Sequence, residues 1–178
     1  MTQTEAFIQR LQSLQAGEQS RLRRLAGQPL DETLPGFDLF TGLWWPLRQR
    51  SPAVPRREPS WLVAKVFGAF PLPDAPAARL ASVLGRCEPR DELGRDRFRA
   101  RFDSLLQTPS SRLERPLLWA LSVAADVVAA GRARGIAWAQ LLDDLSIWER
   151  GEQHRRRRDV RDDWAEQYLK AVYQPERS

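Results

Sequence analysis

The chain has 178 residues with 42% hydrophobic and 29% charged side chains, a composition typical of a folded globular protein and not of a disordered tail. Its length suits one domain or two small lobes and excludes a large multidomain assembly. The formal net charge is +5, and only Lys65 and Lys170 among the 28 Lys and Arg residues are lysines. Because the guanidinium group pairs well with phosphate, this composition favours a polyanionic partner, although a GC-rich genome would also enrich arginine.

The first part of the chain predicts several short helices, because its apolar residues recur three and four positions apart. Ser20 is expected to cap the second helix, and the third is expected to end near Pro46, since proline cannot donate a helical hydrogen bond. Ser60 is expected to cap the fourth helix, after an exposed proline-rich loop over 51–59. These helices are expected at 5–15, between Gly17 and Gly27, within 31–45 and at 61–69.

The rest of the chain shows the same helical spacing. In one long helix Phe98 and Phe102 belong to an apolar stripe, and Ser110 or Ser111 is expected to cap the helix that follows. Arg132 and Arg134 follow that helix, where the helix macrodipole favours cations. The helices are expected at 77–84, at 90–107, up to Gly131, from Ile136 onward and at 160–172.

No segment alternates apolar and polar residues as a half-buried strand does. The expected fold class is therefore all-α, with about eight helices in two packed, bundle-like lobes over 1–75 and 76–178. No stretch reaches the roughly 20 apolar residues of a membrane-spanning helix, so no membrane partner is expected. With no secretory signal pattern and a single cysteine, Cys87, the expected location is cytoplasmic.

Few side chains in the sequence could carry out catalysis. The single histidine, His154, adjoins four arginines and is expected to be solvated, and Cys87 is expected to be a partly buried thiol. One Cys and one His cannot form a zinc site of the Cys/His kind, and no glycine-rich phosphate loop is present. We therefore expect no enzyme activity, no cofactor and no metal. A metal-dependent nuclease remains as an alternative that rests on Asp143, Asp144, Asp162 and Asp163. Adjacent helical residues do not share a face, which does not suit a shared metal ion, and these carboxylates are expected to be solvated.

Arginine is unevenly distributed along the sequence. Any one cluster could be an ordinary solvated face, but several clusters on a helical chain favour a track that neutralises phosphates without reading bases. No base-reading motif is present, and most tryptophans lie on apolar stripes and are expected in the core. The candidate nucleic-acid-binding residues are Arg21, Arg23, Arg24, Arg95, Arg97, Arg99, Arg101, Arg132, Arg134, Arg155, Arg156, Arg157, Arg158 and Arg161.

Several segments, taken in order between about Leu11 and Tyr173, resemble one known family. They are Leu22-Arg23-Arg24, Arg97-Phe98 with Arg101-Phe102 and Leu105-Leu106, the run from Ala137 to Leu145 with Trp148, and the run from Arg161 to Ala165. The sequence of these segments resembles the CasB family, the small subunit of the type I-E CRISPR effector complex called Cascade.

The resemblance implies an all-α, non-catalytic subunit that assembles with the other Cascade subunits. Two copies would lie head to tail and help to hold the guide RNA, the target DNA strand and the displaced strand of the R-loop. The resemblance assigns the basic positions best to Arg23, Arg24, Arg97, Arg101 and Arg161, and the other candidates rest on charge alone. The alternative is a purely structural adaptor, whose arginines pair with acidic partner subunits or with internal carboxylates.

Overall fold

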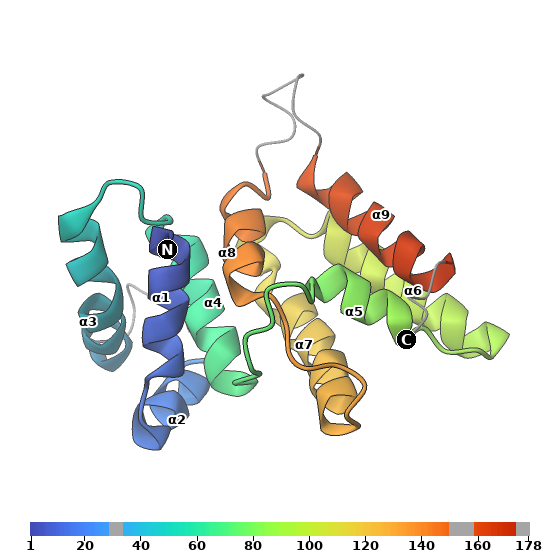
Figure 1. Cartoon of the computed structure of the whole chain (residues 1–178), viewed down its shortest axis with the longest axis horizontal. Coiled ribbons are helices and arrows are strands. Elements are labelled where there is room, and N and C mark those ends of the chain that lie inside the picture. The colour runs from blue at the N-terminus through green and yellow to red at the C-terminus, as the bar shows by residue number, and fades with distance from the viewer. Residues whose placement is uncertain (29–33, 150–158, 174–178) are drawn as a thin grey trace. The chain divides into compact units, whose positions relative to one another are not determined.

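The computed structural model describes residues 1–28, 34–149 and 159–173 (Figure 1). In this part of the chain the fold is all-α, with nine α-helices, one short 3-10 helix and an isolated β-bridge between Asp74 and Ile136. The chain divides into two compact units, Met1–Pro71 and Leu72–Ser178. None of the described helices is long and apolar enough to cross a membrane.

The first unit forms its core around one aromatic ring. Phe40 is 1% exposed, makes edge-to-face contacts with Phe7 and Trp61, and stacks on Trp44. These contacts join three helices that are separate in sequence, so the aromatic cluster fixes their packing. The helices of this unit are α1 (Gln3–Gln12), α2 (Ala16–Arg24), α3 (Leu34–Arg50) and α4 (Arg57–Ala69).

Two helix boundaries of the first unit that lie near prolines differ from the sequence expectation. α3 continues through Pro46, whose missing N–H costs one hydrogen bond, because Leu47 beyond it is buried at 4% exposure and holds the last turn on the core. α4 begins before Pro59, which lies in the first turn, where no helical N–H bond is required. Ser60 is consequently a buried helical residue and not the cap.

The second helix, α2, packs closely against α4. A Cβ added at Gly68 of α4 would lie 2.6 Å from the Cβ of Leu22, so only glycine allows this approach. α2 also begins earlier than expected, because Glu18 accepts a 2.9 Å hydrogen bond from the backbone N–H of Gln15. The expected cap, Ser20, therefore lies inside the helix.

The second unit is built on three buried tryptophans. Trp138, Trp148 and Trp164 are at most 2% exposed, as their helical spacing predicts. Each indole N–H has an acceptor, which removes the cost of burying a polar group. These acceptors are the Leu72 carbonyl at 2.8 Å, the Thr108 carbonyl at 2.9 Å and Oδ2 of Asp144 at 2.7 Å, respectively.

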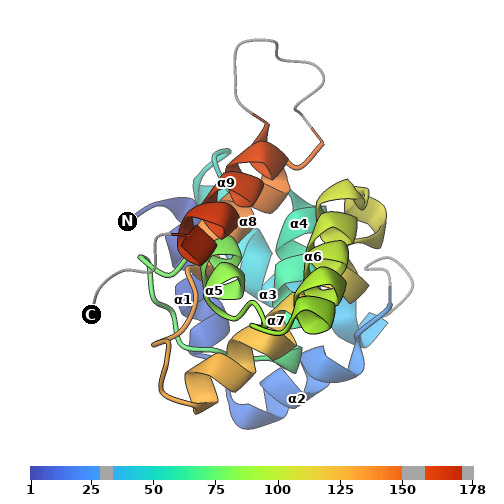
Figure 2. The ribbon, with the colours of Figure 1, turned by 90° about the vertical axis from the view of Figure 1, so that its right-hand side faces the viewer.

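Six helical elements surround this core, and α5 packs against α9 and α7 (Figure 2). Ser110 and Ser111 do not cap α7 as expected, since they belong to a separate 3-10 helix. The backbone N–H and hydroxyl of Ser110 instead donate to Oε1 of Glu149, at 2.8 and 2.7 Å. The elements are α5 (Leu80–Arg86), α6 (Glu92–Gln107), η2 (Ser110–Arg112), α7 (Glu114–Ala129), α8 (Trp138–Ser146) and α9 (Val160–Tyr173).

Candidate nucleic-acid interface

Three candidate arginines cover the solvent side of α2. Arg21, Arg23 and Arg24 are all exposed and lie in the last turn of the helix, where the macrodipole favours positive charge. Leu22 is the buried residue of this turn, so the arginines fan out over the opposite side. None of the three forms an ion pair within the part of the chain that the structure describes. Their charge is therefore available to an external anion.

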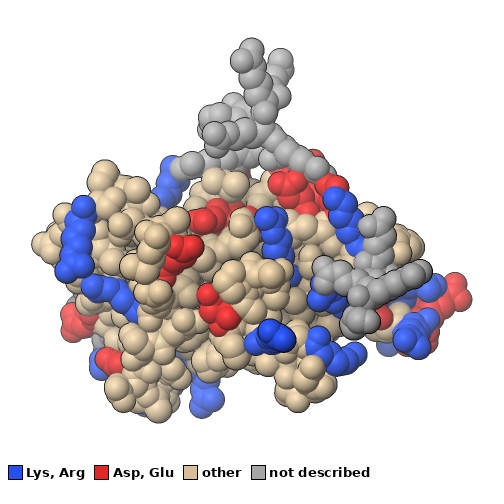
Figure 3. All heavy atoms as spheres, in the orientation of Figure 1, with Lys and Arg blue, Asp and Glu red and all other residues tan. Residues whose placement is uncertain are grey.

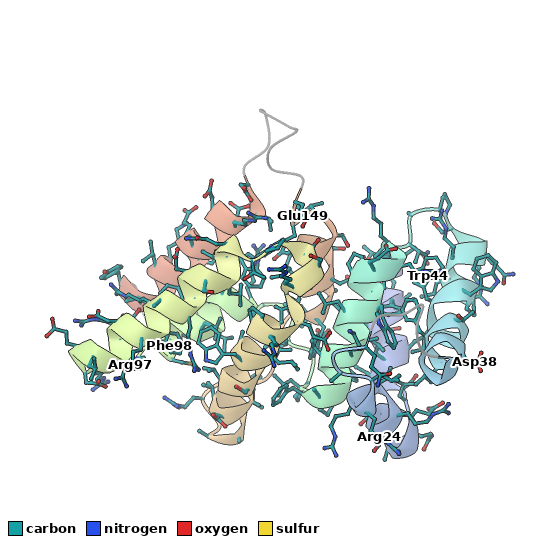
Figure 4. All side chains as sticks on the ribbon, turned by 180° about the vertical axis from the view of Figure 1, so that it is seen from behind. Arg24, Asp38, Trp44, Arg97, Phe98 and Glu149 are labelled. Atoms are coloured by element: carbon teal, nitrogen blue, oxygen red, sulfur yellow. The ribbon has the colours of Figure 1, made fainter. Side chains whose placement is uncertain are left out.

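The four arginines of α6 divide into two pairs. Residues four apart share one side of a helix, whereas residues two apart lie on opposite sides. Arg95 and Arg99 accordingly share one side and are half-buried, while Arg97 and Arg101 share the other side and are exposed. Arg97 is seen at the surface of α6 in Figure 4. The structure thus places these four candidates in two different environments.

On the half-buried side, Arg99 is engaged by a carboxylate of its own chain. Its Nε and Nη2 donate to the two oxygens of Glu88, both at 2.8 Å, in a bidentate ion pair. The side chain of Glu88 is 7% exposed and also accepts a hydrogen bond from the hydroxyl of Tyr168. The ring of Tyr168 stacks on Phe102, with centroids 4.3 Å apart. Arg99 therefore contributes to packing between α6 and α9, and its guanidinium is already occupied.

The pKa values of this cluster reflect its burial and pairing. Burial alone would raise the pKa of Glu88, but the hydrogen bonds from Arg99 and Tyr168 and the charges of Arg99 and Arg95 together lower it. The bond to Glu88, followed by one to Tyr173, raises the pKa of Arg99. Burial and the neighbouring carboxylate raise the pKa of Tyr168. At neutral pH the cluster thus holds a charged pair and a neutral phenol.

On the exposed side of α6, Arg101 contacts a tryptophan. Its guanidinium carbon lies 5.8 Å from the ring centroid of Trp119 on α7, in a cation–π contact. Trp119, which lies on or beside an apolar stripe and is therefore expected in the core, is half-buried and meets Phe98 edge to face at 5.3 Å. Arg115 is exposed one turn before Trp119, on the same side of α7. Sequence reasoning missed Arg115, although its spacing from Trp119 was a usable signal.

The remaining candidates are more scattered. Arg132 and Arg134 are exposed in the segment after α7. Arg161 is half-buried, with its guanidinium carbon 5.6 Å from the ring centroid of Trp148 and with its Nε lacking a hydrogen-bond partner among the described residues. Its charge also helps to lower the pKa of Glu149, after the larger effect of the hydrogen bonds from Ser110. Residues 155–158 and His154 lie outside the described residues.

Asp and Glu residues lie among the basic residues on the face drawn in Figure 3. In the first unit the structure groups Arg21, Arg23 and Arg24, and in the second it places Arg97 and Arg101 on one exposed side of α6. We call these two sets the α2 group and the α6 pair. A polyanion bound to such separate sites would be held at its backbone and would not be read base by base.

Two of the residues considered for catalysis, Asp144 and Cys87, are partly buried. Asp144 is not solvated as expected: burial raises its pKa, although Trp164 and Gln140 donate hydrogen bonds to it. Burial raises the pKa of the Cys87 thiol despite the nearby charges of Arg132 and Arg86. Within the described ranges, no group of three or more His, Cys, Asp or Glu residues could hold a metal ion.

Comparison with known proteins identifies relatives of this fold. The chain resembles a CRISPR-associated protein of the Cse2 family from Thermus thermophilus, with a TM-score of 0.68, 22% identity and coverage of 95% of this chain and 99% of that one. It also resembles CasB from Thermus thermophilus (TM-score 0.65, 22% identity, 95% and 99% coverage) and M. ruber CasB (TM-score 0.68, 21% identity, 97% and 95% coverage). No curated protein sequence matches the chain.

At these identities the structural likeness shows a shared fold, and the family assignment comes from the sequence. The model of the CRISPR-associated protein Cse2 family matches residues 18–169, which is most of the chain. This region contains both the α2 group and the α6 pair. The match confirms the family resemblance predicted from the sequence: the chain belongs to the CRISPR-associated Cse2 family.

Proposed function

We propose that the chain is a non-catalytic small subunit of the type I-E CRISPR effector complex, and that it binds the backbone of the guide RNA and of both DNA strands of the R-loop. The observation that carries the proposal is the contrast between the two sides of α6 in a protein of this family. Arg99 is neutralised by Glu88, whereas Arg97 and Arg101 are exposed and make no ion pair with a described residue. Exposed, unpaired guanidinium groups are suited to phosphate.

The proposed binding is independent of base sequence. The exposed arginines lie on helix surfaces, and they are accompanied by one half-buried tryptophan rather than by a row of exposed rings. Such an arrangement offers charge for phosphates and little for base edges or for stacking of successive bases. This is the requirement for an R-loop, in which pairing between guide and target supplies the sequence recognition.

The purely structural adaptor remains the second candidate. The ion pair of Arg99 with Glu88 favours it, because this arginine is already paired with a carboxylate. In an adaptor the α2 group and the α6 pair would meet carboxylates of partner subunits, as Arg99 meets Glu88 within the chain. The two candidates predict opposite outcomes for the free protein. An adaptor would bind protein partners and would have no affinity for nucleic acid.

The direct test is binding of the full chain to fluorescently labelled single-stranded DNAs of unrelated sequence, measured by anisotropy over a range of salt. We expect the logarithm of the binding constant to fall linearly with the logarithm of salt concentration, with a slope of about −0.7 per phosphate neutralised. The doubly substituted R97E/R101E protein should bind about tenfold more weakly for each phosphate it no longer holds, which corresponds to about 1.4 kcal/mol per phosphate.

The matched control is R50E/R56E, which reverses the same number of charges at exposed arginines outside the α2 group and the α6 pair. It separates the effect of position from the effect of net charge. Equal weakening by both double variants would reduce the proposal to nonspecific charge attraction. Absence of binding by the unmodified protein at low salt would favour the adaptor.

A further inference from the structure

A shallow pocket of about 360 Å³ lies in the second unit, between the turn that joins α5 to α6 and the last turn of α9. Three arginines contribute to its lining: Arg86, Arg90 and Arg95. Of these, only Arg95 belongs to the candidate interface described above. The pocket is therefore a second concentration of basic side chains, on the side of α6 away from the α6 pair.

The electrostatics of the pocket favour an anion. Its one acidic lining residue is Glu88, whose oxygens are already bound by Arg99 and Tyr168. Neither Arg90 nor Arg95 forms an ion pair within the described ranges. The C-terminal ends of α5 and α9 contribute about half a negative charge each, which together is less than the two positive charges of Arg90 and Arg95.

The neighbouring acidic residue Asp91 does not reduce this charge by pairing with the pocket arginines. Its carboxylate caps α6 by accepting a hydrogen bond from the backbone N–H of Gly94 at 2.7 Å. Arg95, the first arginine of α6, thus lines the pocket, and the capping carboxylate of Asp91 does not pair with it.

The volume and the remaining lining of the pocket favour a ligand that carries an apolar part besides its anionic group. A phosphate or carboxylate group alone would fill a small part of the volume. Pro89, Ala171 and Val172 give the rest of the lining an apolar character. An apolar wall beside a few polar anchors is the usual construction of a small-ligand site, and it suits a sugar or base attached to a phosphate.

We propose that this pocket binds one nucleotide of a single-stranded nucleic acid. Arg90 and Arg95 hold the phosphate, and the sugar and base lie against Pro89 and Val172. The choice of a nucleotide over an acidic side chain rests on the proposed function, because an arginine fork accepts either group. On this proposal the pocket is a fixed point at which a strand is held locally, in addition to the more open α2 group and α6 pair.

The test uses the full chain labelled with ¹⁵N and follows the Nε–Hε resonances of Arg90 and Arg95, which R90Q and R95Q assign. Adenosine 5′-monophosphate should shift both resonances saturably and leave the resonance of Arg50 unchanged. It should bind at least about tenfold more tightly than inorganic phosphate, because the apolar wall contacts the nucleoside. Equal affinity for the two probes, unchanged resonances, or tighter binding of a glutamate-rich peptide would overturn the proposal.

A second measurement separates this inference from the proposed function. R90Q/R95Q and the matched control R50Q/R56Q are compared with the unmodified chain for binding to labelled single-stranded DNA. A loss confined to R90Q/R95Q, with unchanged thermal unfolding, supports the pocket. If the unmodified chain binds DNA and both variants bind equally well, the pocket proposal fails while the proposed function stands. If the unmodified chain binds no DNA, the proposed function fails, and the monophosphate titration still decides the pocket.

Discussion

Replacing Arg99 by glutamine removes both donors of the bidentate pair and leaves the carboxylate of Glu88 in place at 7% exposure. A hydrogen bond to a charged group contributes about 1.5–3 kcal/mol, and breaking a fully buried ion pair costs about 3–5 kcal/mol. The Arg99 side chain is 39% exposed, so water compensates part of the loss. We therefore expect R99Q to lower the free energy of unfolding by about 2 kcal/mol at pH 7, within the range for a hydrogen bond to a charged group and below that for a fully buried ion pair.

The same pair predicts a dependence on pH. The pKa of Glu88 in the folded protein lies below its ordinary value of 4.5. A lowered carboxyl pKa contributes stability that is present above the unfolded-state value and is lost as the pH falls through the folded-state value. The difference in stability between the unmodified protein and R99Q should therefore be full at pH 7 and should shrink below about pH 4.5, as Glu88 becomes protonated.

Urea denaturation followed by circular dichroism measures both effects. The control is R97Q, which removes an exposed guanidinium two residues away on the same helix and should change the free energy of unfolding by less than about 0.5 kcal/mol. The single variant E88Q and the double variant R99Q/E88Q complete a cycle that isolates the pair from other effects of the substitutions. If R99Q and R97Q are equally stable at pH 7, the assignment of Arg99 to internal packing is wrong.

Three further substitutions or reactions test other parts of the structure. W164F removes the indole donor to Asp144 and should cost about 1–2 kcal/mol in urea denaturation, since Gln140 still donates to that carboxylate; an unchanged midpoint would contradict the role of this bond. G85A places a Cβ against the backbone of α9 and should cost about 1–3 kcal/mol, whereas G17A, with no atom within 4 Å, should be neutral or stabilising; equal effects would refute the close approach. Cys87, whose pKa is raised chiefly by burial, should react with iodoacetamide more slowly at pH 8 in the folded than in the urea-unfolded protein, and equal rates would argue against its burial.

Much of the helical core could be predicted from the sequence because its signals are local. Trp138, Trp148 and Trp164 recur at helical spacing with other apolar residues, and all three are buried. Helix boundaries were less predictable, since tertiary packing overrode the local signals. The burial of Leu47 carries α3 through Pro46, which by itself favours a helix end.

Only part of the candidate interface could be predicted from local sequence patterns. Helical periodicity already separates Arg97 and Arg101 from Arg95 and Arg99, so the two sides of α6 could have been distinguished from the sequence. The carboxylate that pairs with Arg99 could not be predicted from the sequence, because Glu88 precedes Arg99 by eleven residues and lies outside the helix. A count of arginines therefore overstates the positive charge that remains available to an external ligand.

The half-buried position of Asp144 likewise depends on a residue that is distant in the sequence. Its local spacing beside Asp143 is that of a solvated helix position, and the sequence offers no sign that it is buried. The indole of Trp164, twenty residues later on another helix, supplies the hydrogen bond that accompanies its burial. Contacts over such separations follow from the packing of helices and not from the pattern within any one of them.

Retention of target DNA by the CRISPR effector complex, rebuilt with variants of this subunit, tests the central proposal most directly. R23E/R24E/R97E/R101E should assemble with the other subunits, retain less target DNA than the unmodified protein, and show a shallower dependence on salt. R48E/R50E/R56E/R112E, which reverses four exposed arginines outside the α2 group and the α6 pair, is carried through the same assembly and controls for altered net charge. Undiminished retention by the fourfold variant at moderate salt, with assembly intact, would contradict a role for the α2 group and the α6 pair in holding the nucleic-acid backbone.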